Sequence, residues 1–314
     1  MSSVTISSEP PTDWAAACAK EGLLFHSGDW ISLLDSAFNV RTQYVWDEAT
    51  ACGGAVSSFA AGPFKLGYLG FPYGGLVGGA GLNDEILQSW REQLSGLLPM
   101  AIRIPASAFA ESVDLKLPFE PTPETAIVDL PSWTLAATSG NHRRDIKKAI
   151  RSGLEILDAD PAEDGVEIFK IYHDTVKRHR GGLRYNETYF RDLVALAQSN
   201  PHVRVTVARL DKKMAGFTVV IRHGSVACYL HGGIDLNYRA YQPSALLLNE
   251  AIEWAKGRGC QCFNLMSSPA SQQSLVWYKE KWGAETREHR SFTLVLRSSY
   301  QLFRIAERLS RLLR

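Results

Sequence analysis

The alternation of apolar and polar positions is clearest in the second half of the chain. Segments with apolar residues every three or four positions are typical of helices, and shorter segments rich in β-branched and aromatic residues are typical of strands. The first pattern predicts helices over residues 139–151, 161–178, 186–198, 243–257, 271–282 and 300–314. The second predicts strands over residues 154–157, 203–210, 214–222, 225–231, 260–266 and 290–296. The turns at 211–213 and 223–224 are short enough for antiparallel hairpins, so this half is predicted to be α/β with a three-stranded meander.

The first half has a weaker pattern. It predicts helices over residues 11–20 and 83–98, a further helix after Trp30, and strands over residues 42–46, 55–60, 101–104 and 125–130. Residues 62–81 are rich in glycine and aromatic residues but contain no GxGxxG phosphate loop. Residues 105–131 hold five prolines, which is typical of a connection. We therefore expect one domain over residues 1–135, a second over 136–298 and a C-terminal helix over 299–314.

Composition and charge narrow the class of protein. The chain has 314 residues, 45% of them hydrophobic and 21% charged, which is typical of a globular protein. The net charge of +1 hides a difference between the halves, because residues 1–140 carry a charge of −9 and residues 141–314 a charge of +10. A basic half attracts phosphate-bearing ligands or polyanions. An uneven scatter of charges without function is the alternative interpretation.

Targeting and cysteine signals are weak. The chain has no apolar run of the roughly 18 residues that a membrane span needs and no signal-peptide pattern, so we expect a cytoplasmic protein. The five cysteines have neither a disulfide framework nor zinc spacing, so we expect free buried thiols and no metal site.

A set of motifs in the second half resembles the Fem family, whose members are relatives of the GNAT acetyltransferases. The motifs follow one another in the family's order over about 150 residues. They are residues 141–153 (NHRRDIKKAIRSG), Ala215-Gly216, residues 229–235, residues 243–255 (PSALLLNEAIEWA), Gly259, residues 263–265 and residues 278–283 (YKEKWG). A weaker similarity in residues 25–34 and 67–81 points to a degenerate first domain.

The resemblance implies a fold and an activity. The fold is α/β (α+β), with tandem GNAT-like domains whose mixed, mostly antiparallel sheets are flanked by helices. The activity is acyl transfer. Three departures limit the transfer of detail: residues 238–243 replace the glycine-containing phosphate loop of acetyl-coenzyme A enzymes, Asn264 stands where relatives often have aspartate, and the long helical arm of some relatives is missing.

Four residues are candidates for catalysis. The resemblance places Lys279 near the substrates, where a cation could stabilise negative charge on the acyl carbonyl or on a phosphate. His231 and Asp235 follow the last meander strand, and either could accept the proton of an amine. Tyr229 is a candidate proton donor to the leaving group. The alternative is structural: a surface lysine, a hydrogen-bonding histidine and packed tyrosines.

The candidate binding residues surround these four. The start of the predicted helix at Ser244 offers backbone N–H groups to an anion, and Gln242 could add a contact. Aromatic and basic side chains are further candidates for contacts with substrate or phosphate, namely Tyr241, Tyr278, Arg143, Arg144 and Arg184. Helix capping and solvated charge are the alternative interpretations. The C-terminal helix places residues 302, 305, 309 and 312 on one face; it could dock on the domain or lie on a membrane surface.

The sequence therefore predicts an N-acyltransferase that transfers an acyl or aminoacyl group to an amine or hydroxyl of a cell-envelope or polysaccharide precursor. We expect no tightly bound cofactor, and the phosphate-bearing donor is either acyl-coenzyme A or an aminoacyl-tRNA. The latter would make the protein a tRNA-dependent peptidyltransferase of the peptidoglycan type. We expect a cytoplasmic location, with peripheral contact at the inner face of the membrane through residues 300–314 as an alternative. An alternative of another class is a non-catalytic scaffold that binds polyanions or glycans.

Overall fold

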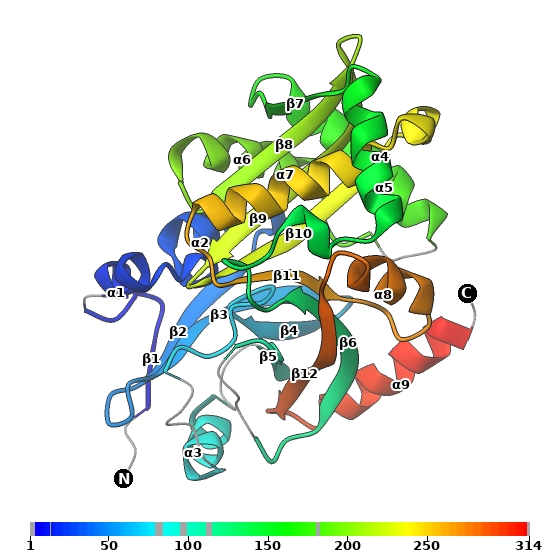
Figure 1. Ribbon diagram of the computed structural model, residues 1–314. Coiled ribbons are helices and arrows are strands. Elements are labelled where there is room, and N and C mark those ends of the chain that lie inside the picture. Colours follow the sequence, from blue (N-terminus) through cyan, green and yellow to red (C-terminus); the bar gives the residue numbers. More distant parts are fainter. Residues whose placement is uncertain are drawn as a thin grey trace. The chain divides into compact units, whose positions relative to one another are not determined.

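The computed structural model describes residues 4–12, 14–78, 84–94, 99–110, 115–179 and 183–312, with side chains up to residue 307. The chain forms two compact units (Figure 1). The first comprises Met1–Ile31, Phe38–Thr122 and Glu288–Arg314, and the second comprises Ser32–Ala37 and Pro123–Arg287.

The sheet of the first unit has the strand order β1-β2-β3-β4-β5-β12. Its strands are β1 (Val4–Ser7), β2 (Arg41–Asp47), β3 (Cys52–Ala61), β4 (Phe64–Leu69), β5 (Ala101–Ala106) and the end of β12 (Glu285–Val295). The pairs are antiparallel except for β4 with β5. The helices are α1 (Trp14–Glu21), α3 (Asp84–Leu94), α9 (Ser299–Leu312) and the start of α2 (Gly28–Phe38).

The sheet of the second unit has the order β6-β11-β10-β9-β8-β7, and only β10 with β11 is parallel. Its strands are β6 (Phe119–Ile127), β7 (Glu155–Asp158), β8 (Val203–Leu210), β9 (Lys213–His223), β10 (Val226–Ile234) and β11 (Cys262–Ser267). Its helices are α4 (Gly140–Arg151), α5 (Asp164–Arg178), α6 (Glu187–Ser199), α7 (Pro243–Gly257) and α8 (Gln273–Glu280). The predicted meander is thus confirmed as β8, β9 and β10.

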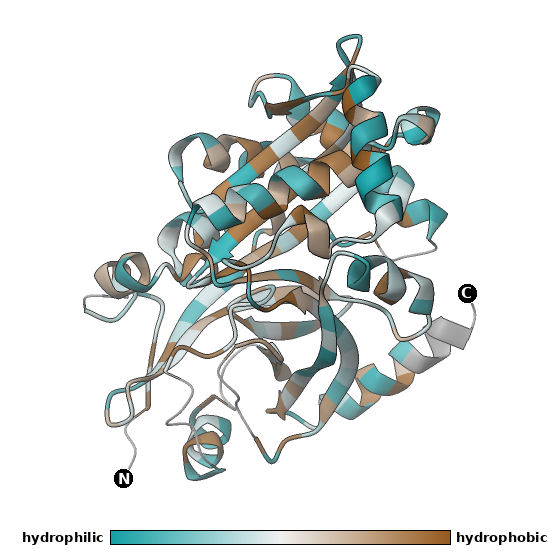
Figure 2. Cartoon of the chain, viewed as in Figure 1, coloured by the Kyte–Doolittle hydropathy of each residue, from teal (hydrophilic) through white to brown (hydrophobic). Residues whose placement is uncertain are grey.

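Helices cover both faces of this second sheet. Neighbouring residues of a strand point to opposite faces of the sheet. On β9, a Cβ at Gly216 would lie 3.3 Å from Leu247, so this position faces α7. The ring of the next residue, Phe217, lies 6.0 Å from that of Phe190 and so faces α6. Apolar residues of α4 and α7 form one core cluster with β8, β9 and β10. Figure 2 shows apolar residues, in brown, along much of β8 and β9.

Local signals set the ends of several helices in this unit. The Ser139 hydroxyl caps α4 by accepting a hydrogen bond from His142 N, and the Asn186 amide oxygen caps α6 by accepting from Tyr189 N. Gly153 follows α4 with a φ of 80°, the left-handed conformation that stops a helix at low cost. These caps agree with the predicted starts of both helices.

The compact units divide the chain differently from the predicted domains. The prolines at 121 and 123 do not interrupt β6, in which the Pro123 carbonyl accepts a hydrogen bond from Ser268 N at 2.8 Å. Residues 288–314 belong to the first unit rather than to a second domain or a separate helix. Periodicity shows that a segment is a strand or helix, but it does not show which sheet the segment joins.

Helix α9 uses a different face from the predicted one. Tyr300 is buried with Leu66 and Met100, and Phe303 packs on the same cluster. Leu302 and Ile305, which the docking alternative placed on the packed face, are 63% and 55% exposed. The predicted partners at 309 and 312 lie outside the described side chains. The larger aromatic surface of Tyr300 and Phe303 has displaced the aliphatic face from the contact.

Candidate active site

The sheet of the second unit opens between its two parallel strands. Strands β10 and β11 pair from Val226 with Cys262 to Cys228 with Asn264, and the described residues form no further pair between them. A register shift in β10 follows at once, between Tyr229 and His231. Beyond the last pair lies a cavity of about 830 Å³. Its size is in the range of small-molecule sites.

Strands and helices of the second unit, with the loop before α7, contribute to this cavity. Strand β10 supplies residues 229–234 except His231, and β11 supplies residues 265–267. Helix α7 contributes its first turns, α8 contributes residues at both of its ends, β9 contributes one residue, and the end of α5 lies at one side. The apolar part of the wall consists of Phe217, Leu230, Ile234, Leu247, Leu248, Leu265, Met266 and Leu275. Four of the seven motifs that resembled the Fem family therefore meet at one cavity, namely residues 229–235, 243–255, 263–265 and 278–283.

Lys279 lies in the wall of the cavity and is only 7% exposed. Its ammonium donates to the Met266 carbonyl at 2.8 Å, to the Ser268 hydroxyl at 2.8 Å and more weakly to the Ser267 carbonyl at 3.3 Å. An ammonium has three N–H donors, so the end of β11 occupies all three in this state. Lys279 is thus a buried cation that clamps the strand end, not the surface lysine of the structural alternative.

Burial lowers the pKa of Lys279 to about 8, and the carboxylate of Glu124 opposes part of this shift. Because the value lies so near neutrality, Lys279 changes charge within an ordinary working range of pH.

Glu124 is a site residue that the sequence analysis missed. It lies on β6, is fully buried and accepts a hydrogen bond from the Asn264 side-chain amide at 2.7 Å. The loss of the acidic residue at 264 is therefore matched by a carboxylate on the adjacent strand. The available signal was a glutamate directly before the strand predicted over residues 125–130.

Two tyrosines of the predicted set, Tyr229 and Tyr278, line the cavity. Burial raises the pKa of both phenols, and the side chains of Ser244 and Trp282 oppose part of the shift at Tyr278. Both phenols therefore stay protonated and can donate hydrogen bonds. Gly232 makes the room for Tyr229, because a Cβ at position 232 would lie 1.9 Å from the Tyr229 hydroxyl oxygen.

Basic side chains line part of the cavity. Arg178, His179 and Arg239 are exposed and contribute to its lining, together with Ser244 from the start of α7. Arg178 and Arg239 were not among the predicted binding residues, although each is a basic residue at the end of a predicted helix or in the loop before the next one. Guanidinium groups at the mouth of a cavity suit a phosphate-bearing ligand.

His231 points away from the cavity. Its imidazole Nε2 lies 3.1 Å from the Tyr189 hydroxyl, and its ring packs against Tyr185, with 4.6 Å between the ring centroids. Burial lowers the pKa of His231 to about 3, so the ring is neutral. The register shift after Tyr229 turns position 231 toward α6, and this placement favours the structural interpretation over the predicted role as proton acceptor.

Asp235 lines a smaller cavity of about 350 Å³, which shares Arg178 and Ile234 with the larger one. Its carboxylate accepts a hydrogen bond from Asn237 N at 2.9 Å. Glu167, Asp174 and Lys170 also line this second cavity. Asp235 is thus beside the main cavity and among other carboxylates, not within it.

The remaining predicted residues are not among those that line the main cavity. Gln242 precedes α7 with a left-handed φ of 61°, and Tyr241 is 39% exposed. Arg143 donates to the carbonyls of Ala136 and Thr138, and Arg144 donates to the Asn141 side chain. Arg184 is exposed at the end of a stretch outside the described residues.

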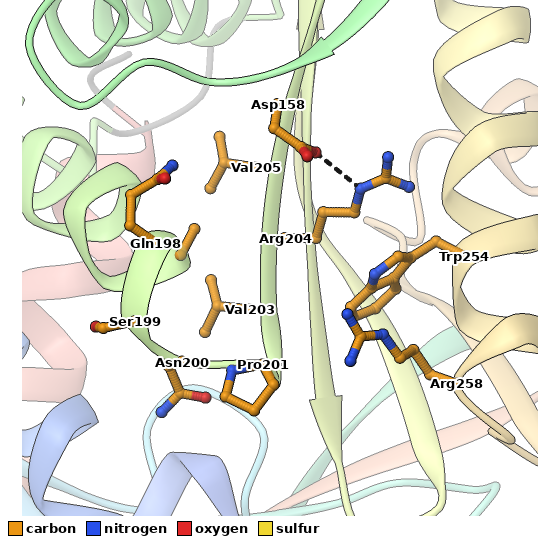
Figure 3. A pocket seen from close by; sticks show the side chains of 11 residues that line it. Asp158, Gln198, Ser199, Asn200, Pro201, Val203, Arg204, Val205, Trp254 and Arg258 are labelled. Atoms are coloured by element: carbon orange, nitrogen blue, oxygen red, sulfur yellow. Dashed lines mark hydrogen bonds and ion pairs between the residues drawn. The ribbon is translucent and has the colours of Figure 1, made fainter.

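A further cavity of about 320 Å³ lies where α6 ends and β8 begins (Figure 3). Arg204 pairs there with Asp158 at 3.1 Å, and the Arg258 guanidinium lies 5.6 Å from the centre of the Trp254 ring. Because none of the candidate site residues of the sequence analysis lines it, this cavity is a weaker candidate than the one at Lys279.

Other classes of site have no support in the described part of the chain. No three His, Cys, Asp or Glu side chains within it are arranged to hold a metal ion. None of its helices combines the length and apolar character required to cross a membrane. All five cysteines are buried and free, as expected.

Comparison with known proteins agrees with this geometry. Residues 138–280 match the family model of the acetyltransferase (GNAT) domain. No curated protein sequence matches the chain. Among solved structures, FemX is similar with a TM-score of 0.65 and 13% identity, over 96% of this chain and 99% of that one.

Two other solved structures are similar over most of their length. The C-terminal domain of a putative lysylphosphatidylglycerol synthetase from Agrobacterium fabrum has a TM-score of 0.58 and 14% identity, over 93% of this chain and 94% of that one. A tandem GNAT protein from the clavulanic acid biosynthesis pathway has a TM-score of 0.52 and 12% identity, over 93% of this chain and 98% of that one. The chain therefore has a Fem-like tandem GNAT fold, and its residues 138–280 match the GNAT acetyltransferase domain.

Proposed function

We propose that the protein is an acyltransferase that moves an uncharged acyl group from a phosphate-bearing donor to an amine. The observation that carries this proposal is the cavity between β10 and β11, which brings together Lys279, Tyr229 and Tyr278. The GNAT domain match over residues 138–280 supports the class of reaction.

The separation of the two strands provides a place for the donor carbonyl. In a continuous sheet, the edge of β10 that faces β11 would bind its neighbour through backbone N–H groups. Past Cys228 that edge faces the cavity instead. An N–H group at such an edge can bind the oxygen of a thioester or ester carbonyl, and it binds more tightly as charge develops on that oxygen.

The charge of the cavity favours an uncharged acyl group. The described residues that line it include Arg178, Arg239 and Lys279 but no aspartate or glutamate. An aminoacyl group carries an ammonium, which would meet these cations without a carboxylate partner. An aliphatic acyl group instead fits the apolar wall, while the arginines suit the phosphates of a donor such as a coenzyme A thioester.

The acceptor amine is proposed to enter from the side of the smaller cavity. Glu167, Asp174 and Asp235 line that cavity and attract a protonated amine, and it shares Arg178 and Ile234 with the larger one. A cell-envelope or polysaccharide precursor is the proposed acceptor class. The structural neighbour named as a putative lysylphosphatidylglycerol synthetase supports a lipid-linked version of that class.

The proposed reaction follows from these groups. The free amine attacks the acyl carbonyl carbon, its nitrogen forms the new amide bond, and the bond from carbon to the leaving sulfur or oxygen breaks. The phenol of Tyr278 or Tyr229 donates a proton to the leaving group and takes one back from solvent, and the attacking nitrogen releases its extra proton to solvent as the amide forms. The Lys279 cation stabilises the intermediate oxyanion through its field, because its own hydrogens bind the end of β11.

Transfer from an aminoacyl-tRNA is the second candidate function. The Fem-like fold, with 99% of the FemX chain covered, is the observation that favours it. This second function requires the cavity to accommodate the α-ammonium of the aminoacyl group beside its basic residues.

The test is to offer both donors to the purified protein. Transfer is measured as release of free thiol from acetyl- and decanoyl-coenzyme A with an amino sugar as acceptor, and binding of charged and uncharged tRNA is measured across a salt series. Thiol release that needs the amine supports the proposal. Salt-sensitive binding of charged tRNA without thiol release supports the second candidate. Binding without any transfer would contradict both and favour a polyanion- or glycan-binding scaffold.

A further inference from the structure

A buried polar chain leads from β6 to the ammonium of Lys279. It starts at Glu124, whose carboxylate is fully buried and accepts the Asn264 side-chain N–H at 2.7 Å. Asn264 is itself only 1% exposed. Burying a carboxylate costs free energy unless donors bond to it. The hydrogen bond between Glu124 and Asn264 therefore holds both side chains in place.

The second step of the chain shapes the end of β11. The Asn264 side-chain oxygen accepts the backbone N–H of Met266 at 2.7 Å. Met266 has a φ of 67°, a left-handed conformation that a side chain other than glycine rarely adopts. The pairing of β11 with β6 shifts register in the same place, between Asn264 and Ser267. The Asn264 amide thus holds the turn at the end of the strand.

The third step fixes the lysine. Because β11 turns at Met266, the Met266 carbonyl and the Ser268 hydroxyl both face the Lys279 ammonium, each at 2.8 Å. Ser268 is anchored in turn, since its N–H donates to the Pro123 carbonyl at 2.8 Å, one residue before Glu124. The cradle of Lys279 is therefore built from both β6 and β11.

We propose that Glu124 and Asn264 are positioning residues, which hold the cradle of Lys279 and keep its ammonium charged at the cavity wall. The catalytic consequence rests on the proposed acyltransferase function. The effect on the lysine itself does not, because it follows from the contacts alone.

The charges around the lysine support this assignment. Burial lowers the pKa of Lys279, and Glu124 is the charged group that raises it again. Two thiols face the same carboxylate, Cys228 on β10 and Cys262 on β11, and burial with Glu124 raises the pKa of both, so they stay neutral. Tyr278 on α8 and Tyr229 on β10 stay neutral for the same reason, since burial raises their pKa values.

The test uses a reversal of the pair. Glu124→Gln keeps an acceptor for the Asn264 amide but removes the charge. The double variant Glu124→Gln/Asn264→Asp returns a carboxylate to the pair, with the glutamine amide as donor and the aspartate still able to accept the Met266 N–H. Glu280→Gln is the matched control. It also removes a carboxylate, the one next to Lys279 in sequence, but that carboxylate accepts a hydrogen bond from the Thr286 hydroxyl and takes no part in the cradle of Lys279.

The first readout needs no turnover. Lys279 is acetylated with a small anhydride at a series of pH values, and its modification is counted by peptide mass spectrometry. The midpoint should fall by about one pH unit in Glu124→Gln, return to the wild-type value in the double variant and stay there in the control. Circular dichroism and melting temperature select the variants that are folded.

The second readout is catalytic. At about pH 8, kcat should fall roughly fivefold in Glu124→Gln with KM for the donor unchanged, and the double variant should recover most of it. Unchanged labelling midpoints in a folded Glu124→Gln, or a midpoint that the double variant fails to restore, would overturn the proposal. Shifted midpoints in a protein that transfers no acyl group would uphold the positioning role and refute the proposed function alone.

Discussion

Replacing Lys279 by methionine tests the burial of its charge directly. The substitution keeps an unbranched apolar side chain of similar length but removes the ammonium that donates to Met266, Ser267 and Ser268. The usual pKa of lysine is 10.5, and in the folded protein that of Lys279 is about 8. This difference corresponds to about 3 kcal/mol of unfavourable interaction with the charged form.

The sign of the pH dependence follows from the two pKa values. Below about pH 8 the folded and unfolded states both hold the proton, so the wild-type protein carries the full penalty. Between about pH 8 and 10.5 the unfolded state keeps the proton and the folded state loses it. The stability of the wild type should therefore rise relative to that of Lys279→Met by up to about 3 kcal/mol across this range.

The assay is urea unfolding of both proteins at several pH values, followed by tryptophan fluorescence. Subtracting the two free energies of unfolding at each pH removes the contributions of all other titrating groups that the variant leaves unchanged. A difference that stays constant from about pH 7 to pH 10 would refute the argument, because it would mean that the pKa of Lys279 is the same in both states.

Three further substitutions test the cavity. Gly232→Ala places a Cβ 1.9 Å from the hydroxyl oxygen of Tyr229 and should cost about 1–3 kcal/mol of stability and most of the activity. Gly257→Ala is the control and should cost no stability, because its Cβ meets no atom within 4 Å. Equal melting temperatures for the two variants would contradict this prediction. Tyr278→Phe removes a protonated phenol from the cavity wall and should lower kcat about 10- to 100-fold with donor affinity retained, so an unchanged kcat would exclude it as proton donor. Arg239→Gln should raise KM for a phosphate-bearing donor about tenfold and weaken the salt dependence of that KM. It should leave KM for a short thioester without phosphate unchanged. Equal effects on both donors would mean that the phosphates bind elsewhere.

The sequence predicted the elements of the second unit well because their signals are local. The meander of β8, β9 and β10 follows from segments rich in β-branched and aromatic residues joined by two short turns, and α4 and α6 begin directly after Ser139 and Asn186, whose side chains cap them. The resemblance to the Fem family pointed to Lys279 and Tyr278, which belong to one short motif in residues 278–283, and both residues line the cavity.

Other residues of the site could not be found in this way. Glu124 and Asn264 are 140 residues apart in sequence, and no periodicity connects β6 with β11. His231 and Tyr229 are two positions apart on one strand and would share a face in a regular strand, but the register shift between them turns His231 toward Tyr189. A bulge of this kind moves the following side chains to the opposite face of the sheet, and no clear sequence signal marks it.

By itself, the sequence determined the helices and strands of the second unit, the presence of a basic half and the motif that contains Lys279. Each of these depends on residues within a few positions of one another. The tertiary structure decided where β10 and β11 separate, which side chains line the cavity, and that Glu124 faces the cradle of Lys279. It also decided that α9 packs through Tyr300 and Phe303 rather than through Leu302 and Ile305. The physical reason is that periodicity shows which face of an element is apolar, whereas burial, pKa and cavity depend on which distant element covers that face.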